Sequence, residues 1–195
     1  MPSRTPRAAT REDSVPETAA ALVDLLNSRP YAGMPDKLDT PGSATAVLRP
    51  FGQEDDDAPS PRRVELVRAV RDDLIALAEH HDPDDSAADW AAFSGRVSSV
   101  AFQQDFSVPG TVSMRQTSGD PVVGRITLAV AELVDAGTWS RLRLCASEIC
   151  REVFYDTSRS RTRRWHSYEV CGNRANVAAY RARTGASAPA GDAAH

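Results

Sequence analysis

The sequence predicts an α+β protein: a mainly α-helical N-terminal domain with a small antiparallel sheet, followed by a small knuckle–hairpin–helix metal module. Apolar residues recur at three- and four-residue spacing in several segments between residues 16 and 137, as in helices with one buried face. All three cysteines fall in one 27-residue window near the C-terminal end. The expected organisation is a disordered arm at 1–15, the helical domain at 16–140, the metal module at 141–184 and a disordered tail at 185–195.

Helical spacing is clearest over 61–81, where Ser60 precedes Pro61 as a candidate N-cap. The apolar face of this helix is expected to consist of Val64, Val67, Val70, Leu74 and Leu77. Further helices are expected over 16–27, 87–97 and 122–137, the second after a turn at 83–86. In the last helix, the residues expected to be buried are Ile126, Val130, Leu133 and Val134. Residues 28–61 contain six prolines and are expected to be mostly loop.

A small antiparallel sheet is expected between residues 100 and 114. Apolar residues alternate there with other residues, and a Pro109–Gly110 turn interrupts the pattern. The alternating pairs are Val100 with Phe102, Phe106 with Val108, and Val112 with Met114.

The cysteine window has the spacing Cys145-x4-Cys150-x15-His166-x4-Cys171, which is two close pairs separated by a loop. Tetrahedral Zn²⁺ takes cysteine sulfur and histidine nitrogen, and a close pair supplies two ligands from one turn. Three unrelated thiols would rarely cluster so tightly. A disulfide framework fits poorly, because three is an odd number and the first residues lack a secretory pattern. The sequence therefore predicts a Zn²⁺ site at Cys145, Cys150, His166 and Cys171, and a cytoplasmic location.

The net charge of −4 is divided unevenly along the chain. Residues 141–183 contain ten arginines and four acidic residues, whereas residues 1–140 contain 13 basic and 22 acidic residues. A basic metal module on an acidic body favours nucleic-acid binding. The alternative is a solvated basic surface that docks on the acidic domain. No phosphate-binding or dinucleotide glycine motif is present, and the adjacent His80 and His81 fit a helix end better than catalysis, so no enzyme is expected.

The segment from about Leu142 to Arg183 resembles the CGNR zinc finger family, named for the tetrapeptide Cys171-Gly172-Asn173-Arg174. The resemblance also rests on the first cysteine pair, on Phe154, Asp156 and Ser158, and on the run Arg163-Arg164-Trp165. It implies an ABATE-type N-terminal domain and a role as a transcription regulator, often stress-associated. The family usually has cysteine where this chain has His166, which makes a Cys3His site in place of an all-cysteine site.

Within the module, two short strands are expected at Val153–Tyr155 and Arg163–Trp165, followed by a helix that Asn173 caps and that Val177 and Tyr180 pack inward. If Arg163–Trp165 is extended, Arg159, Arg161, Arg163 and Trp165 lean to one face, and arginines at that spacing can follow a phosphate backbone. The expected nucleic-acid contacts are Arg159, Arg161, Arg163, Arg164, Arg174 and Arg181, with Arg164 alternatively paired to Asp156 or Glu169. Trp165 and Tyr168 are expected to be core residues rather than base-stacking platforms.

Two function hypotheses follow. The first is a DNA-binding transcription regulator that contacts double-stranded DNA, with a homodimer and a small-molecule effector of the N-terminal domain as further expectations and no membrane partner. The alternative is a zinc-stabilised protein-interaction module, or an RNA binder, without DNA-binding activity.

Overall fold

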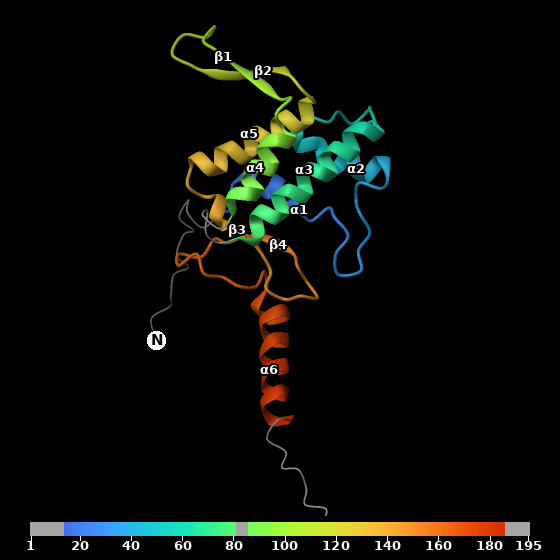
Figure 1. The fold of residues 1–195 in the computed structure, drawn as a ribbon, viewed down its shortest axis with the longest axis vertical. Helices are drawn as coiled ribbons and strands as arrows, with labels where there is room; N and C mark the ends of the chain where they lie inside the picture. The colour runs from blue at the N-terminus through green and yellow to red at the C-terminus, as the bar shows by residue number, and fades with distance from the viewer. Residues whose placement is uncertain (1–13, 81–85, 186–195) are drawn as a thin grey trace, which may run out of the picture.

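The computed structural model of the chain describes residues 14–80 and 86–185 (Figure 1). The predictions of a disordered arm at 1–15, a turn at 83–86 and a tail at 185–195 fall almost entirely outside these ranges. Helices form the body, a two-stranded hairpin extends from one end of it, and a helix projects from the opposite end. The predicted α+β class is confirmed.

In the part of the chain that the structure describes, the body contains five α-helices and the short 3-10 helices η2 and η4. In chain order they are α1 (Glu17–Leu26), α2 (Pro41–Leu48), η2 (Arg49–Phe51), α3 (Pro61–Glu79), α4 (Ala87–Arg96), α5 (Pro121–Asp135) and η4 (Trp139–Arg141). Their buried faces share one core, in which the largest side chains with no more than 2% exposure include Leu22, Leu26, Leu48, Leu74, Ile126 and Leu133.

The four predicted helices of the body are confirmed, and α3 has the predicted start. The Ser60 hydroxyl accepts a hydrogen bond from the Arg63 N–H at 3.2 Å, and Pro61 occupies the first turn, where its missing N–H costs nothing. Of its predicted apolar face only Val64 is not fully buried. On α5 the burial of Val134 was predicted wrongly, because this side chain is 44% exposed on the outer side of the helix.

The prediction of mostly loop at 28–61 was wrong for 41–51, which forms α2 and η2. Pro41 lies in the first turn of α2, a position that accepts proline, and Ala44, Val47 and Leu48 bury the inner face of the helix. Two of the prolines that suggested loop therefore lie inside helical turns, Pro41 in α2 and Pro50 in η2.

Two small antiparallel sheets are present in the described residues. In the first, β1 (Ala101–Asp105) pairs with β2 (Ser113–Ser118), which confirms the predicted sheet, although Phe106 and Val108 lie outside both strands. In the second, β3 (Leu142–Leu144) pairs with β4 (Val153–Tyr155). The predicted pairing of Val153–Tyr155 with Arg163–Trp165 was wrong, because the latter segment is not a strand and β3 is the partner.

The β3–β4 hairpin is packed on the body and is not separated from it by a linker. Leu142, Leu144 and Val153 belong to the same buried cluster as α1, α3 and α5. Residue Asn27, 8% exposed at the C-terminus of α1, donates from Nδ2 to the Val153 carbonyl and accepts at Oδ1 from the Val153 N–H, both at 2.8 Å. One side-chain amide thus forms hydrogen bonds with both the backbone N–H and the backbone carbonyl of Val153 in β4.

The two residues after Asn27 extend this connection. Ser28 is buried and its hydroxyl accepts from Arg71 of α3 at 2.9 Å, and Arg29 donates to the Arg151 carbonyl. Arg151 in turn pairs with Glu79 at the end of α3. The corner at 27–29 therefore joins α1, α3 and the 141–184 segment.

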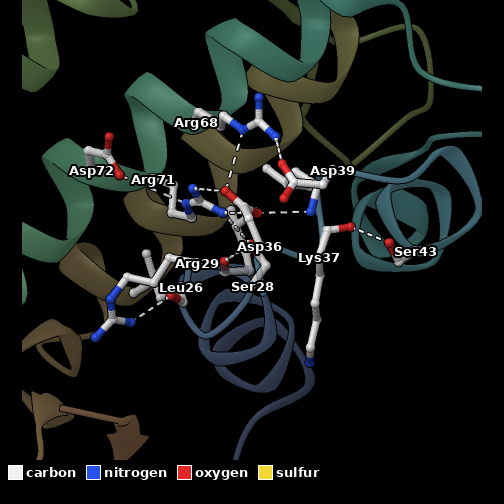
Figure 2. Close-up of polar contacts among 12 residues, drawn as sticks. Leu26, Ser28, Arg29, Asp36, Lys37, Asp39, Ser43, Arg68, Arg71 and Asp72 are labelled. Atoms are coloured by element: carbon white, nitrogen blue, oxygen red, sulfur yellow. Dashed lines mark hydrogen bonds and ion pairs between the residues drawn. The ribbon is translucent and has the colours of Figure 1, made fainter. Parts of the chain in front are cut away.

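Figure 2 shows the polar network that fixes this corner. Arg71, 3% exposed, forms a bidentate ion pair with Asp36, with Nη1–Oδ1 and Nη2–Oδ2 distances of 2.9 and 2.7 Å. Burial acts to raise the pKa of the Asp36 carboxyl, but the hydrogen bonds from Arg71 and the Leu38 N–H outweigh it and the pKa is lowered. The carboxylate therefore stays ionised and holds the loop at 28–40 against α3.

Candidate metal centre

The first two candidate ligands lie on a tight turn that follows β3. Cys145 is the first residue after the strand, and its N–H bonds the Glu152 carbonyl at 2.8 Å. The Cys150 N–H bonds the Ser147 carbonyl at 2.9 Å, and Arg151 adopts a left-handed conformation with φ 54° that returns the chain into β4. These contacts form the predicted knuckle.

The third and fourth candidate ligands come from a loop and a helix. The loop that contains His166 is tied to the knuckle by a bond of 2.8 Å from the Ala146 N–H to the Arg164 carbonyl. Cys171 lies in η5 (Tyr168–Gly172), a π-helical turn that continues into α6 (Asn173–Gly185). Ser167 caps this turn by accepting from the Val170 N–H at 3.3 Å.

The fold brings all four predicted ligands together. Their Sγ and imidazole nitrogen atoms lie within 4.8 Å of one another. His166 Nδ1 is 3.3 Å from Cys150 Sγ and 3.7 Å from Cys171 Sγ. Tetrahedral Zn²⁺, with bonds of about 2.3 Å to sulfur and about 2.0 Å to nitrogen, requires a sulfur–nitrogen separation of about 3.6 Å. The donor set and its spacing therefore fit a four-coordinate zinc ion.

The site is enclosed by a small apolar cluster of its own. Cys145 and Cys171 are 0% and 2% exposed, and Phe154, Cys150 and Trp165 pack with them. The predicted core role of Trp165 is confirmed, whereas Tyr168 is 59% exposed and touches Trp165 only at its edge, with ring centroids 6.0 Å apart. This cluster is too small to stabilise a fold without a metal ion.

Burial makes two thiols of this site, those of Cys150 and Cys171, harder to ionise. It raises the pKa of Cys150 to about 12, with further contributions from the neighbouring cysteines, and it also raises the pKa of Cys171. A bound divalent cation reverses this effect because it stabilises the coordinating thiolates. With raised pKa values, the Cys150 and Cys171 thiols are poor nucleophiles in the absence of a metal ion.

Sequence reasoning missed one contributor to the site, Glu152. Its Oε2 lies 3.3 Å from His166 Nε2, on the ring edge opposite the nitrogen that faces the sulfurs. A carboxylate that accepts the second ring N–H of a ligating histidine fixes its tautomer and orientation. A glutamate two positions after a cysteine does not belong to a recognisable metal-site pattern. Its role becomes apparent only when the fold brings the start of β4 next to the His166 loop.

Replacement of Glu152 is expected to weaken the metal site without removing a ligand. Loss of the carboxylate in Glu152→Ala should reduce metal affinity by roughly 10- to 100-fold, because the imidazole loses its orienting acceptor. A competition titration with a chromophoric chelator measures this. Glu148→Ala is the matched control, since Glu148 is exposed on the same turn. Equal affinities of the two variants would contradict the assigned role.

The helix after the site differs from the predicted one. It begins at Tyr168 with Ser167 as its cap, so Asn173 lies inside it, with helical φ −63° and ψ −40°, and donates to the Glu169 carbonyl. Val177 and Tyr180 are 48% and 61% exposed, so their predicted inward packing was wrong: α6 projects away from the body (Figure 1). At Gly172 a Cβ would lie 2.7 Å from Tyr168 Cδ2, so the missing side chain leaves room for the Tyr168 ring.

The loop at 156–165 is organised by a buried carboxylate. Asp156, 0% exposed, accepts from the Ser158 N–H at 2.8 Å and the Arg163 N–H at 2.9 Å. Burial acts to raise its pKa, but these hydrogen bonds outweigh burial and lower it. Arg161 has φ 53°, so Arg159, Arg161 and Arg163 do not follow one extended strand, and the single face predicted for them was wrong. The alternative pairing of Arg164 with Asp156 was also wrong, because both carboxylate oxygens of Asp156 accept from backbone N–H groups. Arg164 instead stacks on Trp165, 5.2 Å from the ring centroid.

The six arginines predicted to contact nucleic acid fall into two groups. Arg159, Arg161, Arg163 and Arg164 are exposed on the loop, and Arg174 and Arg181 line one shallow groove of about 510 Å³ on α6. Arg163 is engaged within the fold, since it donates to the Trp165 and His166 carbonyls and lies over the Phe154 ring. In the described part of the chain, the side chains of Arg159, Arg161 and Arg174 have no ion pair or hydrogen bond.

The knuckle, the His166 loop and the helix carrying Cys171 together define a metal-binding module of the zinc-finger class. Residues 141–184 match the family model described as CGNR zinc finger, as the resemblance of this segment predicts. The match does not extend upstream, and the ABATE-type assignment of the body stays a prediction. A comparison with curated proteins finds no match to the chain.

Two further observations concern the body. A groove of about 630 Å³ lies between α1, η2 and α5, with Phe51 and Ala129 at its floor and Glu17, Asp24, Arg125 and Glu132 around it.

Among the residues that the structure describes, no helix combines the length and apolar content that crossing a bilayer requires.

Proposed function

We propose that the protein is a DNA-binding transcription regulator whose finger is held together by a structural zinc ion and contacts the duplex through arginines. The observation that carries the proposal is the charge of the finger: ten arginines and four acidic residues lie in 141–183, beside a strongly acidic body. Arginine clusters neutralise phosphates and supply sequence-independent affinity. The protein is expected to act in the cytoplasm as a homodimer, with an effector bound to its helical body.

Zinc is the proposed ion and its role is structural. Three cysteines and one histidine are typical zinc ligands, and four protein ligands fill the tetrahedral shell. A catalytic zinc site instead keeps one position for water or substrate. This supports a binding protein rather than an enzyme.

The exposed arginines provide two contact surfaces. Arg159 and Arg161 lie on the loop that Asp156 organises, where their guanidinium groups can reach phosphates. Helix α6 has 13 residues, a length of about 20 Å, and no acidic residue. A helix of this size fits the major groove of B-DNA, and Arg174 lies in its first turn. The loop would then position the finger, and α6 would approach the bases.

Removal of the two loop arginines is expected to weaken DNA binding across all sequences. The Arg159→Ala/Arg161→Ala variant should lose roughly tenfold or more in DNA affinity. The slope of log K against log salt concentration is negative, and its magnitude should decrease by about two. Fluorescence anisotropy with a random duplex pool measures both quantities. Arg163 is left in place because it supports the His166 loop.

The control for this experiment is Arg62→Ala, which removes an exposed arginine from α3 at a distance from the finger in sequence. Its affinity and salt slope should equal those of the original protein. An unchanged salt slope in the zinc-loaded double variant would refute these two contacts.

The second candidate function is a zinc-stabilised protein-interaction module. One observation favours it: Val170, Val177 and Tyr180 are 46%, 48% and 61% exposed along η5 and α6. Apolar side chains at helical spacing are typical of helices that enter a protein groove. Loss of a protein partner on deletion of residues 173–185, with DNA affinity unchanged, would favour this alternative. RNA binding would instead show as preference for single strands over duplex.

A further inference from the structure

The ten arginines of the finger are not equivalent, because several of them contact other parts of the fold. In the described residues, the arginines that bond carbonyl groups, pair with a carboxylate or stack on a ring are Arg141, Arg143, Arg151, Arg163 and Arg164. The charge of residues 141–183 therefore exceeds the charge that can reach DNA phosphates. Two of these arginines, Arg141 and Arg143, bond the loop at 156–165, which carries the proposed loop contacts.

The alternation of side chains along β3 directs Arg143 towards this loop. Successive side chains of a strand lie on opposite faces. Leu142 and Leu144 are 3% and 9% exposed in the core of the body, so Arg143 between them lies on the other face of the hairpin. Its cross-strand partner is Phe154, which packs at the metal site. This face of the hairpin therefore belongs to the finger.

Both arginines donate to backbone carbonyls of the loop. Arg141 Nη1 donates to the Asp156 carbonyl at 2.7 Å and to the Ser158 carbonyl at 3.2 Å, where the loop begins. Arg143 Nη1 donates to the Arg161 carbonyl in the middle of the loop. Burial acts to raise the pKa of the Asp156 carboxyl, and the charge of Arg143 is among the contributions that lower it, so this guanidinium also lies near the carboxylate.

The Arg143 bond reaches the loop at its one described residue with a positive φ. Arg161 has φ 53°, in the left-handed region that is unfavourable for residues other than glycine. Such conformations persist where surrounding contacts hold them, and they are concentrated at functional sites. Here the Arg161 N–H donates to the Ser158 carbonyl at 3.3 Å, and its own carbonyl accepts from Arg143. The Arg161 side chain remains exposed.

We infer that Arg143 is a positioning residue, which holds the Arg161 backbone in its left-handed conformation and so presents the Arg161 guanidinium to a DNA phosphate. The inference rests on the proposed function, because it concerns how one of the proposed contacts is oriented. A preorganised side chain loses less conformational entropy on binding. Loss of Arg143 therefore weakens DNA binding although no phosphate contact is removed.

A double-mutant cycle on the full zinc-loaded chain tests this inference. Arg143→Ala and Arg161→Ala should each lower the affinity for random duplex DNA by roughly threefold or more, and the double variant should bind no more weakly than Arg161→Ala alone. The magnitude of the salt slope should decrease by about one in Arg161→Ala and stay unchanged in Arg143→Ala. The control pair is Arg143→Ala with Arg174→Ala, whose effects should multiply because Arg174 lies on α6.

Two further measurements separate the bond from general packing and from DNA binding. Arg143→Met keeps the apolar stem of the side chain on the hairpin and should weaken DNA binding as much as Arg143→Ala does. Amide exchange followed by NMR without DNA should be faster at Arg161 and Arg163 in both variants, with β3 and β4 still protected.

Multiplicative effects of Arg143→Ala and Arg161→Ala, or a smaller salt slope in Arg143→Ala, would overturn the inference and leave the proposed function standing. Loop amide exchange that neither Arg143 variant changes would also overturn it, whether or not the protein binds DNA. Absence of DNA binding by the original protein would instead refute the proposed function, and with it the role of Arg143 in binding.

Discussion

Removal of the metal is expected to unfold the finger and to destabilise the helical body with it. Structural zinc sites contribute roughly 10–16 kcal/mol of apparent binding free energy to small modules, far more than the cluster of Phe154 and Trp165 can supply. Because Leu142, Leu144 and Val153 complete the core of the body, loss of the hairpin would also expose α1 and α3. Cys171→Ser should therefore lower the thermal unfolding midpoint of the whole chain.

Hydrogen exchange by mass spectrometry, with and without a chelator, shows where protection is lost. We expect faster exchange in β3, β4 and the C-terminal half of α1. Ser160→Ala is the control, since Ser160 is exposed on the finger loop and bonds only Thr162 among the described residues. Loss of protection confined to 145–172, with the midpoint unchanged, would show that finger and body fold independently.

The second large effect is expected at Asn27. Truncation in Asn27→Ala leaves both the N–H and the carbonyl of Val153 buried without a partner. Each unsatisfied buried group costs about 1–3 kcal/mol, so the loss of both partners should lower the free energy of unfolding by about 2–6 kcal/mol. This is a large share of the stability of an ordinary domain, which is about 5–15 kcal/mol.

Urea unfolding followed by circular dichroism measures this change. Asn27→Asp should also destabilise the protein, because a carboxylate oxygen would then face the Val153 carbonyl. Asn176→Ala removes an amide from the exposed side of α6 and is expected to change stability by less than about 0.5 kcal/mol. A loss at Asn27 no larger than that at Asn176 would contradict the bridging role of this side chain.

Features set by local sequence patterns were predicted correctly, whereas features set by contacts between residues far apart in the chain were not. The four metal ligands were predictable because their chemistry restricts both residue type and spacing. Helix α3 was predictable because its apolar period and its Ser60–Pro61 start agree locally. Asn27 was not, since its partner Val153 lies 126 positions away and a helix-terminal asparagine has many ordinary roles.

The strand pairing of the finger was mispredicted for a related reason. Arg163–Trp165 and Leu142–Leu144 are equally short candidates for pairing with β4, and local pattern does not choose between them. The choice depends on Asp156, whose buried carboxylate accepts hydrogen bonds from the backbone N–H groups of Ser158 and Arg163. These bonds keep the loop at 156–165 irregular. The same loop conformation exposes Arg159 and Arg161, on which the proposed DNA contact depends.

The most direct test of the central claim is an anisotropy titration of the zinc-loaded protein against random duplex DNA at graded salt concentrations. The proposed function predicts binding that weakens steeply with salt and disappears on chelation. Absence of binding at low salt, with zinc confirmed in the protein, would contradict it and leave the protein-interaction module as the better account.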